Sequence, residues 1–336
     1  MLAKGLKKLK TLFSEMKKVS VAIEGGAGYT AGELLRILVN HPNVDVKFVN
    51  SESHKGQPIS VVHQDLYEDA DLNFGEIDFA QIDVIFICKG HGKSIQFLRE
   101  TNLPERVKII DLSEDFRDKK EGFVYGLPEL NRERVKATSK LANPGCFATT
   151  IELALIPLAS AKMLNSDVHI TAITGSTGAG QSLSETTHFS WRNNNISVYK
   201  PFKHQHLKEI SMSICSLQPE FRHSINLIPI RGNFSRGILA SIYTQCHWDG
   251  LTIKKAYKDY YKNHPFIRIV DEMPDLKQVV NTNKCLIYTE KVDDKIYIVS
   301  AIDNLLKGAS GQAVQNMNLM CGFDETAGLK LKGIGF

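Results

Sequence analysis

Short apolar runs alternate with helical patterns over the first 145 residues of the chain. The run Val19–Glu24 (VSVAIE) is typical of a strand, and residues 31–40 (AGELLRILVN) place Leu34, Leu35 and Leu38 on one stripe of a helix. A helix between two apolar strands is typical of a βαβ unit in a sheet covered on both faces. The pattern therefore predicts a doubly wound α/β sheet of Rossmann type, with further strands at residues 44–50, 84–88 and 107–112.

The pattern changes in the second half of the chain. Strand-like runs there are longer and alternate between apolar and polar positions, at residues 169–174, 225–229, 238–244 and 295–301. Such alternation is typical of strands that bury one face in an antiparallel sheet. We therefore predict a second, α+β domain with a mostly antiparallel sheet, followed by a loop and a helix over residues 304–320.

Length and charge limit the class of protein. A chain of 336 residues with 43% hydrophobic and 23% charged residues is expected to form two globular domains. The formal net charge is +4, but the first eighteen residues hold six lysines and one glutamate, so the remainder has a net charge of −1. A nearly neutral body has no broad cationic face, and no nucleic-acid partner is predicted.

The basic N-terminal extension, residues 1–18, has two interpretations. Its apolar residues recur at helical spacing between lysines, which would suit an amphipathic helix at a membrane surface or on a partner protein. A simple extension before the first strand is the interpretation we favour. The extension lacks the continuous apolar region of a secretory signal, and no later segment approaches the ~20 apolar residues of a membrane span. We predict no membrane association.

Cysteine usage indicates a reducing compartment. The chain has six cysteines, which lie far apart and include no CxxC pair. In a chain of this length, these are expected to be reduced thiols, most of them small buried residues. The predicted location is the cytoplasm.

A glycine-rich turn between the first strand and the first helix predicts a dinucleotide site. The spacing Gly25-x-x-Gly28-x-x-Ala31 lets the backbone approach a pyrophosphate at the helix N-terminus, next to Tyr29 and Thr30. The alternative is a tight strand–helix turn with no ligand.

The end of the second predicted strand contains determinants of both nicotinamide cofactors. Ser51, Ser53 and Lys55 would suit the extra phosphate of NADP, whereas Glu52 would suit the ribose hydroxyls of NAD. The residues alone leave NADP and NAD both open.

Among the cysteines, Cys146 is the candidate nucleophile. It follows Asn143-Pro144-Gly145 at the end of the first domain, and a helical stripe begins directly after it. A thiol at a helix N-terminus faces unsatisfied N–H groups and the positive end of the dipole, which favour the thiolate. A buried structural cysteine is the alternative.

The segment Lys203-His204-Gln205-His206 supplies candidate proton partners for this thiol. A single imidazole that titrates near neutrality suffices for acid–base catalysis. Two histidines at alternate positions could also bind a metal, but no third ligand is evident and no metal is predicted. Ordinary histidines in a surface loop are the alternative.

Two arginines and a glycine-rich loop complete the candidate site. Arg117, after the run DLSEDF, and Arg231 could each bind a phosphate or carboxylate, although a structural salt bridge is the more ordinary role for either. The loop from Gly175 to Gly180 could approach a cofactor closely or could be a plain turn.

Several segments together resemble the N-acetyl-gamma-glutamyl-phosphate reductases, a family of the semialdehyde dehydrogenase superfamily in arginine and ornithine biosynthesis. They extend over nearly the whole chain beyond the N-terminal extension: GGAGYTAGELLRIL, DLSEDFR, ANPGCFAT, TGSTGAGQ, YKPFKHQHLKEI and DNLLKGASGQAVQNMN. The combination of ANPGCFAT, the His-x-His pair and the last block is specific to that family. Ala31 stands where many members have glycine.

The resemblance implies an NADP-dependent, phosphate-releasing reductase that forms a thioester on Cys146. His206 is the preferred acid–base residue, and His204 assists it or binds substrate. Substrate contacts are implied for Arg117, Arg231, Asn143 and Lys203. Cofactor contacts are implied for Gly25, Gly28, Tyr29, Thr30, Ser51, Ser53, His91, Gly92, Ser176, Gly178, Gly180 and Asn304.

The resemblance also implies a domain plan and a homodimer or homotetramer. The basic extension (1–18) precedes an NAD(P)-binding domain (19–147) and a catalytic and oligomerisation domain (148–303), and the C-terminal segment (304–336) returns its helix to the nucleotide-binding domain. The partners implied are a small acyl-phosphate substrate and inorganic phosphate.

Other substrates and another class of protein stay open as hypotheses. An N-succinyl-glutamyl, aspartyl or aminoadipyl phosphate would undergo the same chemistry, and the stretch TGSTGAGQSLSETTHFSWRNNN departs from the commoner family pattern. A nucleotide-binding regulator without catalysis is the alternative of another class, but the cysteine and histidine motifs are both intact.

Overall fold

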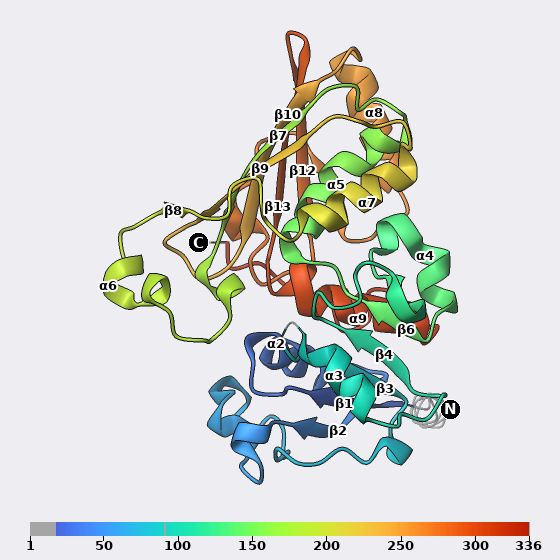
Figure 1. The fold of residues 1–336 in the computed structure, drawn as a ribbon, viewed down its shortest axis with the longest axis vertical. Helices are drawn as coiled ribbons and strands as arrows, with labels where there is room; N and C mark the ends of the chain where they lie inside the picture. The colour runs from blue at the N-terminus through green and yellow to red at the C-terminus, as the bar shows by residue number, and fades with distance from the viewer. Residues whose placement is uncertain (1–17, 91, 336) are drawn as a thin grey trace, which may run out of the picture.

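The computed structural model describes residues 18–90 and 92–335, so the interpretation of residues 1–17 and of His91 lies outside the described part. The chain forms two lobes, each built on one sheet (Figure 1). The first sheet has the order β2 (Val44–Asn50), β1 (Val19–Glu24), β3 (Val84–Ile87), β4 (Lys108–Asp111), β6 (Lys140–Ala142) and β5 (Val124–Tyr125). Its strand pairs are all parallel, which confirms the predicted Rossmann-type sheet.

Alternate residues of the central strands enter two separate cores. Val21 and Ile23 of β1 join the core beneath α2 (Tyr29–Leu38), whereas Ala22 joins the core on the opposite face with α3 (Lys93–Glu100). Strands buried on both faces must be apolar at every position, and this is why they appear in the sequence as unbroken apolar runs. Helix α4 (Pro128–Ala137) covers the same face as α2 through Val135.

The second sheet has seven strands and is mixed. Its order is β11 (Ile267–Val270), β12 (Cys285–Val292), β13 (Lys295–Ile302), β10 (Ile238–Gln245), β7 (Val168–Thr174), β9 (Ile225–Arg231) and β8 (Ser197–Val198). The pairs β11–β12 and β7–β9 are parallel and the other four are antiparallel, as predicted for a mostly antiparallel sheet.

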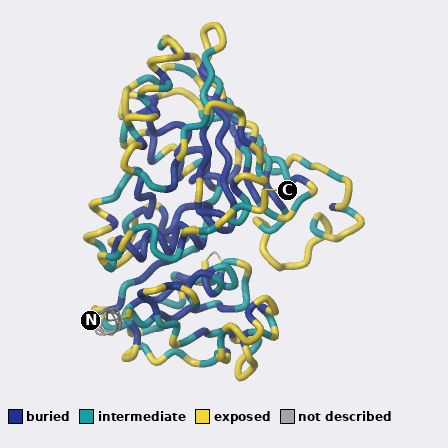
Figure 2. Tube along the Cα trace, turned by 180° about the vertical axis from the view of Figure 1, so that it is seen from behind, coloured by how far each residue is buried: buried dark blue, intermediate teal, exposed yellow. Residues whose placement is uncertain are grey.

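Helices pack on one face of this second sheet. They are α5 (Cys146–Ser160), α7 (Leu207–Leu217) and α8 (Gly250–Tyr261), while the short helix α6 (Phe189–Arg192) lies in an arm that projects from the body (Figure 1). A cluster of buried residues lies between these helices and the sheet (Figure 2). Within the described residues, no helix is both long and apolar enough to cross a membrane.

The chain returns to the first lobe after β13. A five-residue π-helix, η9 (Leu306–Ser310), leads directly into α9 (Gly311–Met320), and all ten residues of α9 are buried. Its apolar residues, Ala313, Val314 and Met317, join the core that contains Val21 and Leu34. One-turn 3₁₀ helices occupy the longer connections, at Glu52–His54, Ile59–Val61, Gln64–Leu66, Phe79–Gln81, Lys120–Gly122, Ser176–Ala179, Glu185–Thr187 and Leu276–Gln278.

Candidate active site

A cavity of about 600 Å³ lies where the two lobes meet. Its walls come from the turn before α2, the start of α5, the loop after β7, the segment before α7 and the turn into η9. Most of the residues predicted for the site line it: Gly28, Tyr29, Thr30, Arg117, Asn143, Cys146, Gly178, Gly180, His204, His206, Arg231 and Asn304. Gly25, Ser51, Ser53, Gly92, Ser176 and Lys203 do not line it.

Cys146 is the first residue of α5. Gly145 before it is extended (φ −73°, ψ 150°), and this conformation ends the approach from β6 and starts the helix. Gly308 of η9 leaves room for the thiol, because a β-carbon there would lie 2.8 Å from Cβ of Cys146. Burial raises the pKa of Cys146 to about 11, although the Arg117 charge and backbone N–H groups at the helix start oppose that shift. The resting group is therefore a thiol, and its use as a nucleophile requires a base.

The two predicted histidines lie together, with ring centroids 4.6 Å apart and the rings nearly perpendicular. His204 is packed edge-on against Phe147 at 5.1 Å, and burial lowers its pKa to about 4. Its Nδ1 accepts a hydrogen bond from the backbone N–H of His206 at 3.3 Å. His204 is thus a neutral imidazole with its proton on Nε2.

His206 is the imidazole that lies directly over the backbone before the thiol. A β-carbon added to Gly145 would overlap the His206 ring at Nε2, so the glycine makes this approach possible. His206 Nε2 also lies 4.0 Å from Oε1 of Glu209, one turn further along the chain. A carboxylate at this distance stabilises the imidazolium that forms when the histidine takes a proton.

Glu209 is a buried residue that the sequence analysis missed. Its Oε2 accepts from the Gly145 N–H and from the Tyr125 hydroxyl, both at 2.9 Å, and its Oε1 accepts from Arg117 at 2.9 Å. The spacing of three residues from His206 at a helix start was the available signal. Glu209 therefore ties the turn before the cysteine to Arg117.

Arg117 lines the cavity but most of its guanidinium is already engaged. Besides Glu209, it donates from Nε to the Asn143 carbonyl at 2.9 Å and from Nη2 to the Leu112 carbonyl at 3.2 Å. Asn143 is engaged too, since its amide donates to the Ala309 carbonyl and accepts from Asn316. Both predicted substrate contacts thus hold the walls of the cavity together.

Arg231, the last residue of β9, is the more available cation. Its guanidinium lies over the Tyr199 ring at 4.8 Å, and among the described residues no carboxylate pairs with it. Its Nε is buried without a hydrogen-bond partner in the described structure. A guanidinium in this state is suited to bind an anionic substrate group.

A second buried carboxyl, Glu152 on α5, lies beneath the same turn. The Tyr125 hydroxyl lies 3.0 and 3.2 Å from the two oxygens of Glu152 and 2.9 Å from Glu209. One hydroxyl proton can serve only one carboxylate, so the other carboxyl must supply a proton of its own. Burial and the neighbouring Glu209 raise the pKa of Glu152 to about 8, which makes Glu152 the protonated member.

The glycine-rich turn has the shape that a dinucleotide requires. Gly25 has φ +82°, and a β-carbon there would lie 2.9 Å from the backbone of Cys88. A β-carbon on Gly28 would meet nothing within 4 Å, so open space adjoins the N-terminus of α2. Gly92, the residue before α3, also has a positive φ, and its N–H donates to the carboxylate of Asp115.

The residues predicted to contact the cofactor ribose lie at and just after the end of β2. Glu52 is 84% exposed, and it accepts at 3.0 Å from Lys89, which also pairs with the buried Glu24. The hydroxyls of Ser51 and Ser53 lie 3.3 Å apart. Glu52 is thus paired with a lysine, and the two serines flank it in the sequence. The described residues contain no cluster of histidine, cysteine or acidic side chains arranged to hold a metal.

The family models match both lobes. Residues 20–138 match the NAD-binding domain of semialdehyde dehydrogenases, and residues 146–304 match their dimerisation domain. The first of these matches supports a nicotinamide cofactor for the first lobe.

Solved structures share the fold at low sequence identity. Aspartate semialdehyde dehydrogenase II of Vibrio cholerae, complexed with ASA, superposes with a TM-score of 0.73 over 91% of this chain and 99% of its own, at 18% identity. The Candida albicans enzyme, solved with NADP, gives a TM-score of 0.68 at 12% identity over 91% of this chain and 99% of its own.

Sequence relatives are much closer. The N-acetyl-gamma-glutamyl-phosphate reductase of Parabacteroides distasonis is 56% identical over 95% of this chain and all of its own length. The enzyme of the same name from Flavobacterium johnsoniae is 53% identical over the same shares. The chain therefore belongs to the semialdehyde dehydrogenase family and, within it, to the N-acetyl-gamma-glutamyl-phosphate reductases.

Proposed function

We propose that this protein reduces N-acetyl-γ-glutamyl phosphate to N-acetylglutamate 5-semialdehyde with NADPH, releasing inorganic phosphate, as a step of arginine biosynthesis. The observation that supports this most directly is the position of Cys146 at a helix N-terminus in the inter-lobe cavity, with His206 over the adjoining glycine. Names of relatives over 50% identical support the same substrate.

The chain's own residues supply the first half of the reaction. His206 takes the proton of Cys146, and the sulfur attacks the γ-carbonyl carbon of the acyl phosphate. The C–O bond to phosphate breaks, phosphate leaves, and a thioester remains on Cys146. Arg231, without a carboxylate partner among the described residues, would bind an anionic group of the substrate.

The second half reduces that thioester. A nicotinamide cofactor, when bound, would supply a hydride to the thioester carbon, and Gly28, Tyr29, Thr30, Gly178 and Asn304 would hold that cofactor along one wall of the cavity. Hydride addition would leave an oxyanion on the carbon bonded to Cys146. This oxyanion collapses to the aldehyde as the C–S bond breaks and the electron pair of that bond goes to sulfur. Imidazolium at His206 returns a proton to the departing sulfur.

We further propose NADP as the cofactor. Lys89 draws the Glu52 carboxylate toward itself, and Ser51 and Ser53 lie next to it as hydroxyl donors for a 2′-phosphate. NAD is the alternative, because an exposed Glu52 that left Lys89 would bind the ribose hydroxyls instead.

The domain plan and assembly belong to the same proposal. We assign residues 19–147 to cofactor binding, 148–303 to catalysis and oligomerisation, and 304–336 to the return to the first lobe. Helices α5, α7 and α8 cover one face of the second sheet. Side chains on the other face, such as Ile173 and Tyr243, are partly exposed. That face is suited to the interface of a homodimer, or of a homotetramer of such dimers. All six cysteines are free thiols, in keeping with a cytoplasmic location.

Phosphate-dependent oxidation of the semialdehyde tests the function. We expect formation of NADPH from N-acetylglutamate semialdehyde, NADP and inorganic phosphate, with lower kcat/KM for the N-succinyl substrate and for NAD. A higher kcat/KM with the succinyl or aspartyl semialdehyde would show that this compound, and not the acetyl form, is the substrate. A preference for NAD would show that NAD is the cofactor.

A further inference from the structure

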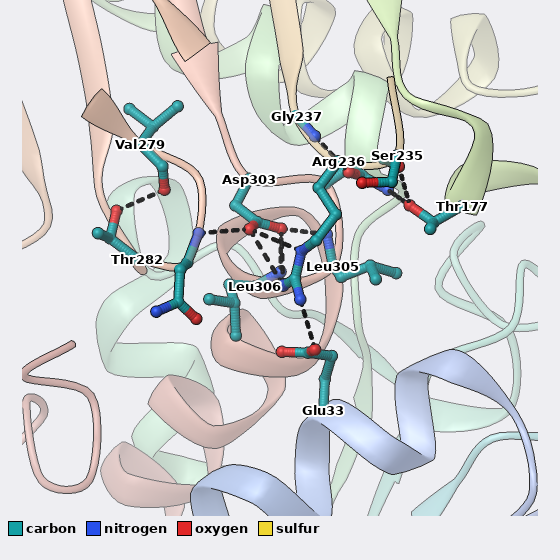
Figure 3. Close-up of polar contacts among 12 residues, drawn as sticks. Glu33, Thr177, Ser235, Arg236, Gly237, Val279, Thr282, Asp303, Leu305 and Leu306 are labelled. Atoms are coloured by element: carbon teal, nitrogen blue, oxygen red, sulfur yellow. Dashed lines mark hydrogen bonds and ion pairs between the residues drawn. The ribbon is translucent and has the colours of Figure 1, made fainter. Parts of the chain in front are cut away.

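One ionic contact joins the dinucleotide helix to the catalytic lobe. Arg236, in the turn between β9 and β10, donates from Nη1 to Glu33 of α2 at 2.5 Å (Figure 3). The other edge of the same guanidinium faces Asp303 at the end of β13, with Nε–Oδ2 of 3.1 Å and Nη2–Oδ1 of 3.2 Å. Asp303 is fully buried, and the Glu33 side chain is only 12% exposed.

Asp303 also fixes the turn that leads to the thiol. Its Oδ1 accepts from the N–H groups of Leu305 and Leu306 at 2.8 and 3.1 Å, and its Oδ2 accepts from the Asn281 N–H at 2.8 Å. These bonds hold the start of η9, whose Gly308 packs against Cys146. The position of Asp303 is therefore coupled to the wall beside the nucleophile.

The turn that contains Arg236 is coupled to the loop after β7. Thr177 donates from its hydroxyl to the Ser235 carbonyl at 2.6 Å (Figure 3). The Thr177 hydroxyl also accepts from the Asn304 amide at 3.0 Å. Asn304 in turn accepts from the N–H of Gly237 at 2.7 Å. Thr177 and Asn304 both line the cavity, so one rigid unit includes the Arg236 turn and the wall opposite α2.

We propose that Arg236 is a positioning residue that sets the separation between α2 and the loops facing Cys146, and thereby controls hydride transfer but not acylation of the thiol. The inference rests on the proposed function. A dinucleotide that spans the cavity would touch α2 at its pyrophosphate and the Thr177–Asn304 wall at its nicotinamide. Acylation involves Cys146, His206 and the substrate, none of which belongs to α2, so it does not depend on this separation.

The planar fork of arginine explains why this residue suits the role. It engages Asp303 with two nitrogens and Glu33 with the third, which fixes direction as well as distance. Lysine keeps the charge but not this geometry. Misplacement of reacting atoms by about 1 Å can cost about 100-fold in rate.

The test separates the two steps in full-length enzyme. Without phosphate, semialdehyde and NADP should give one burst of NADPH per active site, and the burst rate reports hydride transfer. p-Nitrophenyl acetate, which acylates a reactive thiol without cofactor, reports the nucleophile. We expect R236K and E33Q to slow the burst about 10- to 100-fold and to leave p-nitrophenyl acetate turnover within about two-fold of wild type.

R36Q is the matched control. Arg36 also donates to Glu33, at 2.6 Å, but from the same helix, so its loss should leave both rates unchanged. An equal loss of the burst rate and the ester turnover in R236K would show that Arg236 only stabilises the fold. An unchanged burst rate would show that Arg236 has no role in hydride transfer. Either result overturns the proposal. A wild-type enzyme that reacts with the ester but gives no burst would instead contradict the proposed function.

Discussion

Gly145 and His206 are in direct contact: the imidazole occupies the space that a β-carbon on residue 145 would need. The backbone that ends at the nucleophile therefore lies immediately against the ring that we propose as its base. We propose that this contact, rather than the position of the helix alone, lets His206 take the proton of the half-buried Cys146 thiol.

The contact predicts that Gly145→Ala is far more damaging than its size suggests. The added methyl must push the ring away from the start of α5, and we expect kcat/KM to fall about 100-fold or more with little loss of cofactor affinity. Steady-state kinetics and cofactor titration by fluorescence measure the two effects. Gly75→Ala is the control for a glycine substitution, because a β-carbon there would meet nothing within 4 Å and its φ lies outside the left-handed region. Full activity in the Gly145 variant would contradict the arrangement.

Cys146→Ser should abolish reductase turnover and leave cofactor binding within a few-fold, because the thiol lines the cavity at the start of α5 and not at the glycine-rich turn before α2. Cys215→Ser removes an exposed thiol of α7 and should behave as wild type. Mass spectrometry after incubation with semialdehyde and NADP should find the acyl adduct on Cys146. Persistent turnover in the Cys146 variant would rule out the thioester.

His206→Asn should lower kcat by about 10²- to 10⁴-fold, the usual contribution of an acid–base group. His204→Asn should lose less, because burial keeps His204 neutral with a pKa of about 4 and its Nδ1 is already an acceptor. The two variants are compared by kcat and by their pH profiles. A larger fall in kcat for His204→Asn than for His206→Asn would show that His204 is the acid–base residue.

Glu152→Gln should increase stability above neutral pH. Its pKa is raised from 4.5 to about 8, so between these values the unfolded chain loses a proton that the folded protein keeps. The free energy of unfolding of wild type therefore falls with rising pH, by up to about 1.4 kcal/mol per unit, whereas the neutral glutamine lacks this contribution. Below pH 4.5 Glu152 is protonated in both the folded and the unfolded protein, so it no longer makes the free energy of unfolding depend on pH.

Urea denaturation at pH 5, 6, 7 and 8 measures the difference between wild type and Glu152→Gln. Glu133→Gln, at a glutamate whose side chain is 79% exposed, is the control and should show no pH-dependent difference. A difference that is constant with pH would mean that Glu152 is ionised in the folded protein.

The two cavity arginines should respond differently. Arg231→Gln should raise KM for inorganic phosphate or for the semialdehyde, because Arg231 has no acidic partner among the described residues. Arg117→Gln should destabilise the fold by about 3–5 kcal/mol, because it leaves Glu209 buried without its cation. Kinetics and thermal unfolding distinguish the effects, and a stable Arg117 variant with a raised KM would reassign substrate binding to Arg117.

Local patterns were sufficient to predict the sheet class of both lobes. Strands such as β1 and β3 are buried on two faces, so their apolar runs are unambiguous. Strands β11 and β12 were not predicted, since β12 is buried only at its first three residues and then becomes partly exposed. The alternation that would have identified it is missing.

Cys146, His204 and His206 could be predicted to lie in one site because each lies within a short motif, and all three line the cavity. Glu209, Tyr125 and Glu152 were not, because they meet from α7, β5 and α5, which are distant in the chain. The engagement of Arg117 with Glu209 spans 92 residues and has no local signature. Convergence of this kind requires the tertiary structure.

The return of α9 to the first lobe bears on the order of events during synthesis. Leu306, Val314 and Met317 occupy the same core as Val21 and Leu34, although nearly the whole chain separates them. A nascent chain emerging from the ribosome must therefore hold an unfinished nucleotide-binding lobe until its last helix appears. Truncation before Leu306 would expose the apolar surface of that lobe which α9 covers, and would make the lobe prone to aggregation even though every residue of its sheet was present.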